Sequence, residues 1–195
     1  MTGLILEQDE AATPLTPEEQ QSLIPSYITL RHELNAAEQA NILDAEAWAF
    51  ARKRKVLEET FLKNLHKQMF GRVWRWAGAF RLTERNIGVT PYRIGVDLRS
   101  LLDDCRYWIE HGTYPPDEIA ARFHHRLVWI HPFPNGNGRH TRLATDLLLT
   151  GLGRPRFSWG RVSLVDTGKT RLAYVAALRA ADGHDIQPLL AFVRS

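Results

Sequence analysis

A glycine-rich turn followed by a helical pattern is the feature that most limits what this chain can fold into. It lies in the run from His131 to Arg142, HPFPNGNGRHTR. Gly136 and Gly138 lack side chains, so backbone N–H groups can approach an anion closely, and the helix that follows directs the positive end of its dipole at the same point. Arg139 and Arg142 add two cations about one helical turn apart. These residues predict a phosphate-binding turn.

His131 precedes this turn closely enough to accept a proton from a group that attacks a bound phosphate. A base beside an anion site suits nucleophilic displacement at phosphorus. A glycine turn with arginines also occurs as an ordinary loop between helices with a solvated basic end, and the turn alone leaves both interpretations open.

Helical spacing dominates the rest of the chain and predicts an all-α domain with one small β-hairpin. Residues 81–96 carry glycine and proline among β-branched residues, which favours a short hairpin or irregular flap. Residues 98–111 are expected to form a helix that ends at Gly112. Residues 26–70 show helical spacing, with expected buried positions at Ile42, Trp48, Leu57, Phe61, Leu65 and Met69.

The helix expected to deliver His131 follows a pair of prolines, with Asp117 as its predicted N-cap. Its apolar stripe comprises Ile119, Phe123, Leu127 and Ile130. Residues 1–25 are acidic, proline-bearing and weakly periodic, and are expected to form an extended arm.

Composition agrees with a single domain, because 195 residues with 44% hydrophobic content can bury a core without metals or disulfides. The only cysteine, Cys105, excludes an internal disulfide and is expected to be buried. No segment resembles a membrane span or a signal peptide, which favours a cytoplasmic location. The net charge is +3, and the basic run 52–55 is expected to be a solvated helix face, so nucleic-acid binding is not expected.

Two other kinds of site fit the sequence poorly. Residues 163–170 end like a P-loop, but Ser163 stands where that motif requires glycine, and no strand–helix units surround it. An ordinary turn and helix start is the better interpretation. The histidines at positions 124, 125, 131 and 140 lack a convincing tetrahedral ligand set for zinc.

The run 131–142 resembles the signature of the Fic family, His-x-Phe-x-Asp/Glu-Gly-Asn-Gly-Arg-x-x-Arg, at every fixed position except Asn135. The resemblance extends from about Glu38 to the C-terminus. Segments 70–81 and 174–189 carry this wider resemblance to the family. The order of the segments, especially 86–89, 107–112 and 157–160, is similar to that in the Fic subgroup called mobile mystery protein B.

The resemblance implies a helical Fic core at residues 38–195, preceded by an arm at residues 1–37 with a candidate inhibitory helix. It also implies the transfer of AMP from ATP to a serine, threonine or tyrosine hydroxyl of a target protein. In such a site His131 would be the general base, and Phe133 would pack the loop onto the core.

The resemblance further assigns the nucleotide to the turn and to the helix after it. The backbone of residues 136–138, together with the Asn137 side chain, would bind the α-phosphate. Arg139 and Arg142 would hold the β- and γ-phosphates, so that pyrophosphate departs.

Asn135 stands where the family usually has an acid that binds Mg²⁺. An amide lacks the negative charge, although its carbonyl oxygen can still ligate Mg²⁺ (or Mn²⁺) weakly, because Mg²⁺ commonly uses few protein ligands. Three outcomes therefore stay open: retained AMP transfer, transfer of another nucleotide or a phosphate, and a degenerate Fic protein that binds nucleotide or a partner without transfer.

Thr29 to Glu33 matches five positions of the family's inhibitory motif, Ser/Thr-x-x-x-Glu-Gly/Asn, before Leu34 breaks it. The hypothesis is that Glu33 docks on Arg142; the alternative is an exposed helical glutamate.

The family resemblance places the target protein along the flap at residues 81–96, by strand addition. Thr90 and Tyr92 carry hydroxyls there, so self-modification is an option. The subgroup resemblance adds a helix-turn-helix partner in a toxin–antitoxin-like pair.

Overall fold

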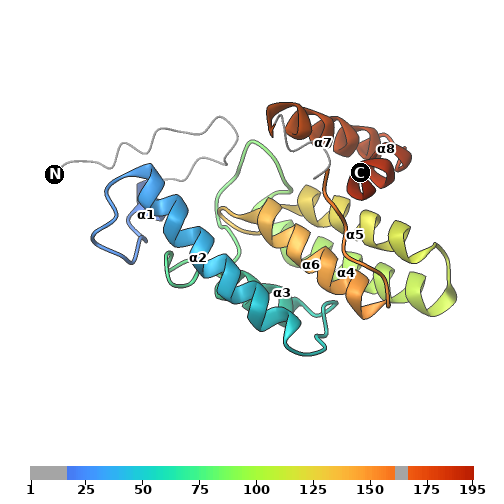
Figure 1. Cartoon of the computed structure of the whole chain (residues 1–195), viewed down its shortest axis with the longest axis horizontal. Coiled ribbons are helices and arrows are strands. Elements are labelled where there is room, and N and C mark those ends of the chain that lie inside the picture. The colour runs from blue at the N-terminus through green and yellow to red at the C-terminus, as the bar shows by residue number, and fades with distance from the viewer. Residues whose placement is uncertain (1–16, 161–166) are drawn as a thin grey trace.

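The computed structural model describes residues 17–160 and 167–195, and helices account for nearly all of its regular structure (Figure 1). They are α1 Pro17–Gln20, α2 Arg31–Phe50, α3 Glu59–Phe70, α4 Ile94–His111, α5 Pro116–Ile130, α6 Asn137–Gly151, α7 Thr167–Asp182 and α8 Gln187–Arg194, with a 3₁₀-helix η1 at Pro91–Arg93. Within the described ranges the β-structure is one isolated bridge between Leu23 and Trp74. The predicted all-α class is confirmed.

Three groups of helices build the domain. α2 packs on α3, α5 lies between α4 and α6, and α7 packs on α8, as Figure 1 shows. α3 and α2 also contact α6, and α8 contacts α5. The α5–α6 pair is therefore the centre of the molecule, and the loop that joins these two helices is held from several directions.

Amphipathic spacing explains why these segments are helices. The α5 stripe predicted from the sequence is buried throughout, with exposures from 0% to 3%. Leu65 and Met69 of α3 are fully buried as expected, and Cys105 is buried as well. The other four predicted positions between 42 and 61 are partly buried and pack against the same core.

The β-hairpin predicted for residues 81–96 is wrong. This segment is irregular up to Thr90, continues into η1, and enters α4 at Ile94. The Arg81 guanidinium donates to the carbonyls of Thr83 and Val89, which a hairpin would need for its ladder, and Pro91 has no N–H to offer. The Arg81 side chain therefore occupies carbonyls that would otherwise bond the opposite strand of a hairpin.

The predicted N-cap role of Asp117 is also wrong, because α5 has Pro115 at its N-cap position and Pro116 at N1. Asp117 instead binds Arg194 of α8 at 2.8 Å and Arg154 at 3.4 Å. It links the C-terminal helix to α5. Gly112, by contrast, ends α4 in the left-handed conformation as predicted.

The expected boundary between residues 37 and 38 falls inside α2, which runs without interruption from Arg31 to Phe50. The buried stripe that holds this helix consists of Leu34, Glu38, Asn41, Ala45 and Ala49. Residues 1–16 of the predicted arm and residues 163–166 of the P-loop-like segment lie outside the described residues. Within the described part of the chain, no helix is long and apolar enough to cross a membrane.

Candidate active site

The loop between α5 and α6 has the backbone of an anion-binding turn. His131 ends α5 with φ +52°, and Gly136 precedes α6 with φ +77°. A Cβ at Gly136 would lie 2.5 Å from the Phe70 ring, so this position requires glycine for both its conformation and its space. The first N–H groups of α6 have no partner within their own helix and carry the positive end of its dipole.

Asn137 closes this loop from inside. Its side-chain amide donates to the Phe133 carbonyl at 2.8 Å and accepts from the Phe133 N–H at 2.9 Å. The residue is 2% exposed. Its side chain therefore positions the turn, and the backbone N–H groups are what the turn can offer to an anion.

Phe133 and His66 anchor the loop to the core. Phe133 is fully buried, as predicted, and its ring stacks on His66 with 3.8 Å between the centroids. His66 Nδ1 accepts from the Gly78 N–H at 2.9 Å, so Nε2 carries the proton and donates to the Asn135 carbonyl at 3.0 Å. Burial holds the pKa of His66 well below its usual value. His66 escaped the sequence analysis, where its only signal was a histidine within the apolar stripe of α3.

His131 is suited to act as a base. Its side chain is buried, with 5% of the residue exposed. Burial first, and then the positive charge of Arg81, lowers the pKa of His131 to about 4, while a hydrogen bond to the Val128 backbone acts in the opposite direction. The imidazole is therefore neutral at pH 7 and can accept a proton.

The two signature arginines have different surroundings. Arg139 forms an ion pair with Glu38 of α2, 2.6 Å between Nη1 and Oε2, and lies over the Phe70 ring. Arg142 is exposed and makes no hydrogen bond or ion pair to the residues described, although its charge lowers the pKa of the buried His124. Arg142 is thus available to a ligand, whereas Arg139 is already engaged.

Glu38 is a second residue that the sequence analysis missed. It is 7% exposed, and besides Arg139 it accepts a hydrogen bond of 2.7 Å from the indole N–H of Trp74. No motif marks it, because its partners lie 36 and 101 positions further along the chain.

The docking of Glu33 on Arg142 does not occur in this structure. The Glu33 carboxylate accepts from the backbone N–H groups of Thr29 at 2.8 Å and Leu30 at 3.0 Å. These bonds, with Thr29 the larger influence, lower the pKa of Glu33. In this structure the Thr-to-Glu spacing serves a helix cap, and the inhibitory role of Glu33 stays a prediction.

The residues around the turn do not fit a resident Mg²⁺ ion. The Asn135 Oδ1 atom accepts from the adjacent Gly136 N–H at 2.5 Å and carries no charge. Within the described ranges no three acidic, histidine or cysteine side chains gather where a metal could bind. Hard divalent cations favour carboxylate oxygens, and the turn offers one engaged amide oxygen instead.

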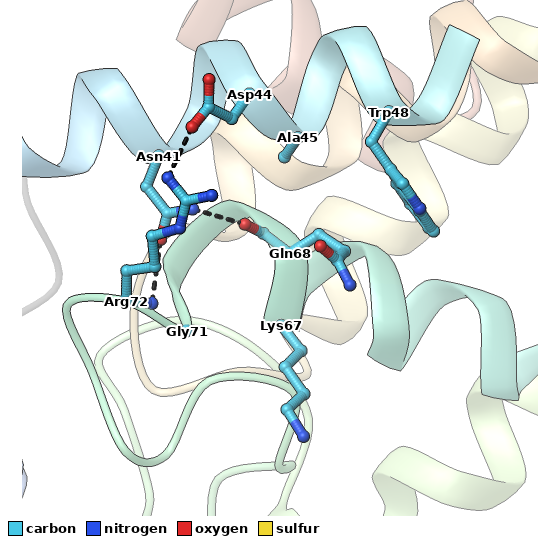
Figure 2. A pocket seen from close by; sticks show the side chains of 8 residues that line it. All are labelled: Asn41, Asp44, Ala45, Trp48, Lys67, Gln68, Gly71 and Arg72. Carbon is cyan, nitrogen blue, oxygen red and sulfur yellow. Dashed lines mark hydrogen bonds and ion pairs between the residues drawn. The ribbon is translucent and has the colours of Figure 1, made fainter. Parts of the chain in front are cut away.

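A hollow of about 390 Å³ lies between α2 and α3, with Asn41, Asp44, Trp48, Gln68 and Arg72 in its wall (Figure 2). Its polar groups bind one another: the amide of Asn41 bonds the Gln68 carbonyl and the Arg72 N–H, and Arg72 pairs with Asp44. None of its lining residues belongs to loop 131–136 or to α6. This hollow is not a candidate for the reaction site.

The described residues thus form a helical domain in which a buried histidine precedes a glycine turn at a helix N-terminus and two arginines follow it. Residues 56–149 match the model of the Fic/DOC family. This stretch of the chain is therefore similar to Fic/DOC domains.

Relatives and solved structures agree with this assignment. The protein adenylyltransferase fic-1 of Caenorhabditis elegans is 32% identical over 124 residues, which are 60% of this chain and 22% of that protein. A Fic domain containing signaling protein from Bacteroides thetaiotaomicron superimposes with a TM-score of 0.64 at 23% identity, over 84% of this chain and 68% of that one. BepC from Bartonella tribocorum, with bound AMPPNP, superimposes with a TM-score of 0.69 at 18% identity, over 92% of this chain and 97% of that one.

The chain spans about a quarter of the length of the curated relatives it matches, between 22% and 26%. The similarity therefore concerns the Fic domain and not their remaining parts. The mobile mystery protein B subgroup stays a prediction.

Proposed function

We propose that this protein transfers AMP from ATP to a serine, threonine or tyrosine hydroxyl of a target protein. The hydroxyl oxygen attacks the α-phosphorus, the bond between the α-phosphorus and the bridging oxygen breaks, and pyrophosphate leaves. The neutral imidazole of His131 takes the hydroxyl proton. The observation that carries the proposal is a neutral, buried histidine next to an anion-binding turn at the start of α6.

The α-phosphate would lie at the backbone N–H groups of residues 136–138, where the helix dipole stabilises developing charge. Asn137 keeps this backbone in place through Phe133. Arg142, which is exposed, would bind a terminal phosphate directly, and Arg139 would do so once its bond to Glu38 is exchanged for a phosphate oxygen.

The choice of AMP over other groups rests on similarity. The matched relatives are named protein adenylyltransferases, and one structure with this fold holds AMPPNP. ATP is accordingly the proposed co-substrate. No step above depends on a protein-held metal, and Asn135 is at most a weak ligand for an ion that the nucleotide brings.

The target would dock at residues 81–96. Leu82, Ile87 and Tyr92 of this segment are large hydrophobic residues exposed by 90%, 49% and 82%. Tyr92 is also the accessible hydroxyl for self-modification, whereas the Thr90 hydroxyl is buried. A helix-turn-helix partner stays a prediction from the subgroup resemblance.

A binding protein without transfer activity is the second candidate. The observation that favours it is the joint presence of an amide at position 135 and an Arg139 already neutralised by Glu38. Such a protein would bind ATP or a partner and leave the hydroxyl unmodified.

Labelled ATP separates these candidates. Purified protein and a cell lysate are incubated with ATP labelled at the α- or the γ-phosphate, with Mg²⁺ or Mn²⁺, using wild type and His131→Ala. AMP transfer gives α-label on protein that disappears in His131→Ala, and no γ-label. A γ-label alone would indicate phosphate transfer, and nucleotide binding without either label would support the binding protein.

A further inference from the structure

Arg81 is one of the largest fully buried side chains of the described residues, with 1% of the residue exposed. Its guanidinium donates to four backbone carbonyls: His131 at 2.7 Å, Thr83 at 3.0 Å, Ile130 at 3.5 Å and Val89. Its own backbone N–H donates to the Pro132 carbonyl at 2.9 Å. One side chain thus joins the end of α5 to the segment 82–90.

The surroundings of Arg81 explain why a charge is tolerated there. Among the residues described, no carboxylate forms an ion pair with it. The Ile130 and His131 carbonyls lie at the C-terminal end of α5, where the helix dipole is negative. A planar guanidinium can serve divergent acceptors at once, which the single ammonium of lysine cannot do.

The backbone that Arg81 holds is strained. His131 has φ +52°, a left-handed conformation that a residue with a side chain adopts at a cost. The bond from Arg81 Nε to the His131 carbonyl compensates for that strain. It fixes the direction in which the His131 side chain leaves the loop.

The segment 82–90 touches the same two residues. Gly88 has φ +102°, and a Cβ built there would lie 2.7 Å from Arg81 Nη2 and 2.7 Å from His131 Cβ. Its backbone therefore packs directly against both. The exposed part of this segment and the candidate base form one connected unit with Arg81 at its centre.

We propose that Arg81 is the positioning residue of this site, which sets the orientation of His131 and ties the target-docking segment 82–90 to it. This inference rests on the proposed function. Displacing the segment would move the His131 backbone through Arg81, so a bound target would contribute to the alignment of the base.

The charge of Arg81 has a separate consequence. The cations that bear on His131 are Arg81 and Arg85, both of which lower its pKa, and Glu84 is the carboxylate that bears on Arg81. Because the neutral base exists only above its pKa, removing the Arg81 charge raises the pKa of His131 and moves the acidic limb of the pH–rate profile upward.

The test compares Arg81→Lys, which keeps the charge, with Arg81→Gln, which removes it. The control is Arg122→Gln, because the partners of Arg122, Glu118 and the Tyr114 ring, lie outside the loop 131–136. Each variant is measured for thermal unfolding, AMPPNP affinity, AMP transfer from pH 4 to 9, and the His131 pKa by NMR.

We expect both Arg81 variants to lose roughly tenfold to a hundredfold in kcat, since small misplacements of a catalytic group have effects of that size. AMPPNP affinity should change less than about threefold, because the Arg81 guanidinium bonds residues 130 and 131 and not the backbone of residues 136–138. Only Arg81→Gln should raise the His131 pKa. A folded Arg81→Lys with the kcat of wild type would overturn the proposal.

The NMR measurement keeps this inference separate from the proposed function. Arg81→Gln must shift the His131 pKa whether or not the wild type transfers AMP. An unchanged pKa in folded Arg81→Gln would overturn the electrostatic part, while a wild type without transfer would overturn only the proposed function.

Discussion

The loop 131–136 and the segment 82–90 both bond to Arg81, but they differ in burial and in what else holds them. The loop is largely buried; the bonds between Phe133 and Asn137 hold it from inside, and His66 anchors it to α3. The segment 82–90 exposes Leu82 and Ile87 and depends on contacts from Arg81. A buried glycine turn therefore lies beside a more exposed segment whose carbonyls at Thr83 and Val89 bond to one buried side chain, Arg81.

The difference between the buried loop and the exposed segment matches two separate requirements of the proposed group transfer. The phosphates need a fixed geometry, because electrostatic stabilisation depends on preorganised donors. A protein target needs a surface that can accept an extended chain. Substitutions in the loop should therefore damage chemistry and stability, and substitutions on the exposed surface of the segment should affect target use alone.

The largest expected effect is that of His131→Ala on transfer. General-base catalysis contributes about 10² to 10⁴ in rate, so AMP transfer should fall by that factor. AMPPNP affinity should stay within a few-fold of wild type, because the turn residues remain. Steady-state transfer and calorimetric binding check the two halves, and a variant that loses both equally would show that His131 supports the turn instead of the proton transfer.

Acid should destabilise the loop region strongly. The pKa of His131 and that of His140 are both lowered to about 4 by burial, and the pKa of His66 is lowered as well. Above about pH 6.5, the pKa of histidine in the unfolded chain, these groups are neutral in both states and do not affect stability. Below that pH the unfolded chain binds protons that the folded protein does not. The free energy of unfolding then falls by about 1.4 kcal/mol per pH unit for each histidine.

Denaturant unfolding at pH 7 and pH 5 measures this loss, which should reach several kcal/mol. A His66→Gln variant should show a shallower dependence on pH by the share of one histidine. Equal stability at the two pH values would contradict the neutral, buried state of these groups.

Gly136→Ala should cost about 1–3 kcal/mol of unfolding free energy, because it combines a left-handed φ with an approach of 2.5 Å to Phe70. Gly138→Ala is the matched control, since a Cβ there meets nothing within 4 Å. Chemical denaturation and AMPPNP binding should both separate the two variants. If Gly138→Ala lost as much stability as Gly136→Ala, the packing of the turn on α3 would not be the cause.

Leu82→Ser should have the smallest effect on stability, within about 0.5 kcal/mol, because this side chain is 90% exposed. Transfer to a protein target should fall through KM, with AMPPNP affinity unchanged. The control is Leu172→Ser on α7, because it also replaces an exposed leucine by serine but lies outside the segment 82–90. Equal KM values for the two variants would place the target elsewhere.

The sequence predicted what depends on neighbours along the chain. The turn, the buried Phe133, the α5 stripe and the end of α4 at Gly112 all follow from local spacing, and all are present. The candidate base is likewise adjacent to its turn.

What the sequence could not reveal depends on partners far along the chain. Glu38 meets Arg139 across 101 positions, His66 meets Asn135 across 69, and Arg81 meets His131 across 50. The prediction of a hairpin was wrong for the same reason. The β-propensity of residues 81–96 was overridden because the Arg81 guanidinium bonds the Thr83 and Val89 carbonyls.

We propose above all that His131 activates a hydroxyl for AMP transfer at this turn. Its most direct test is intact-protein mass spectrometry of the wild-type chain and of captured targets after incubation with ATP, beside His131→Ala. We expect a mass increase of one AMP with the wild type and none with the variant. An unmodified wild type that binds AMPPNP, or equal modification by both proteins, would contradict it.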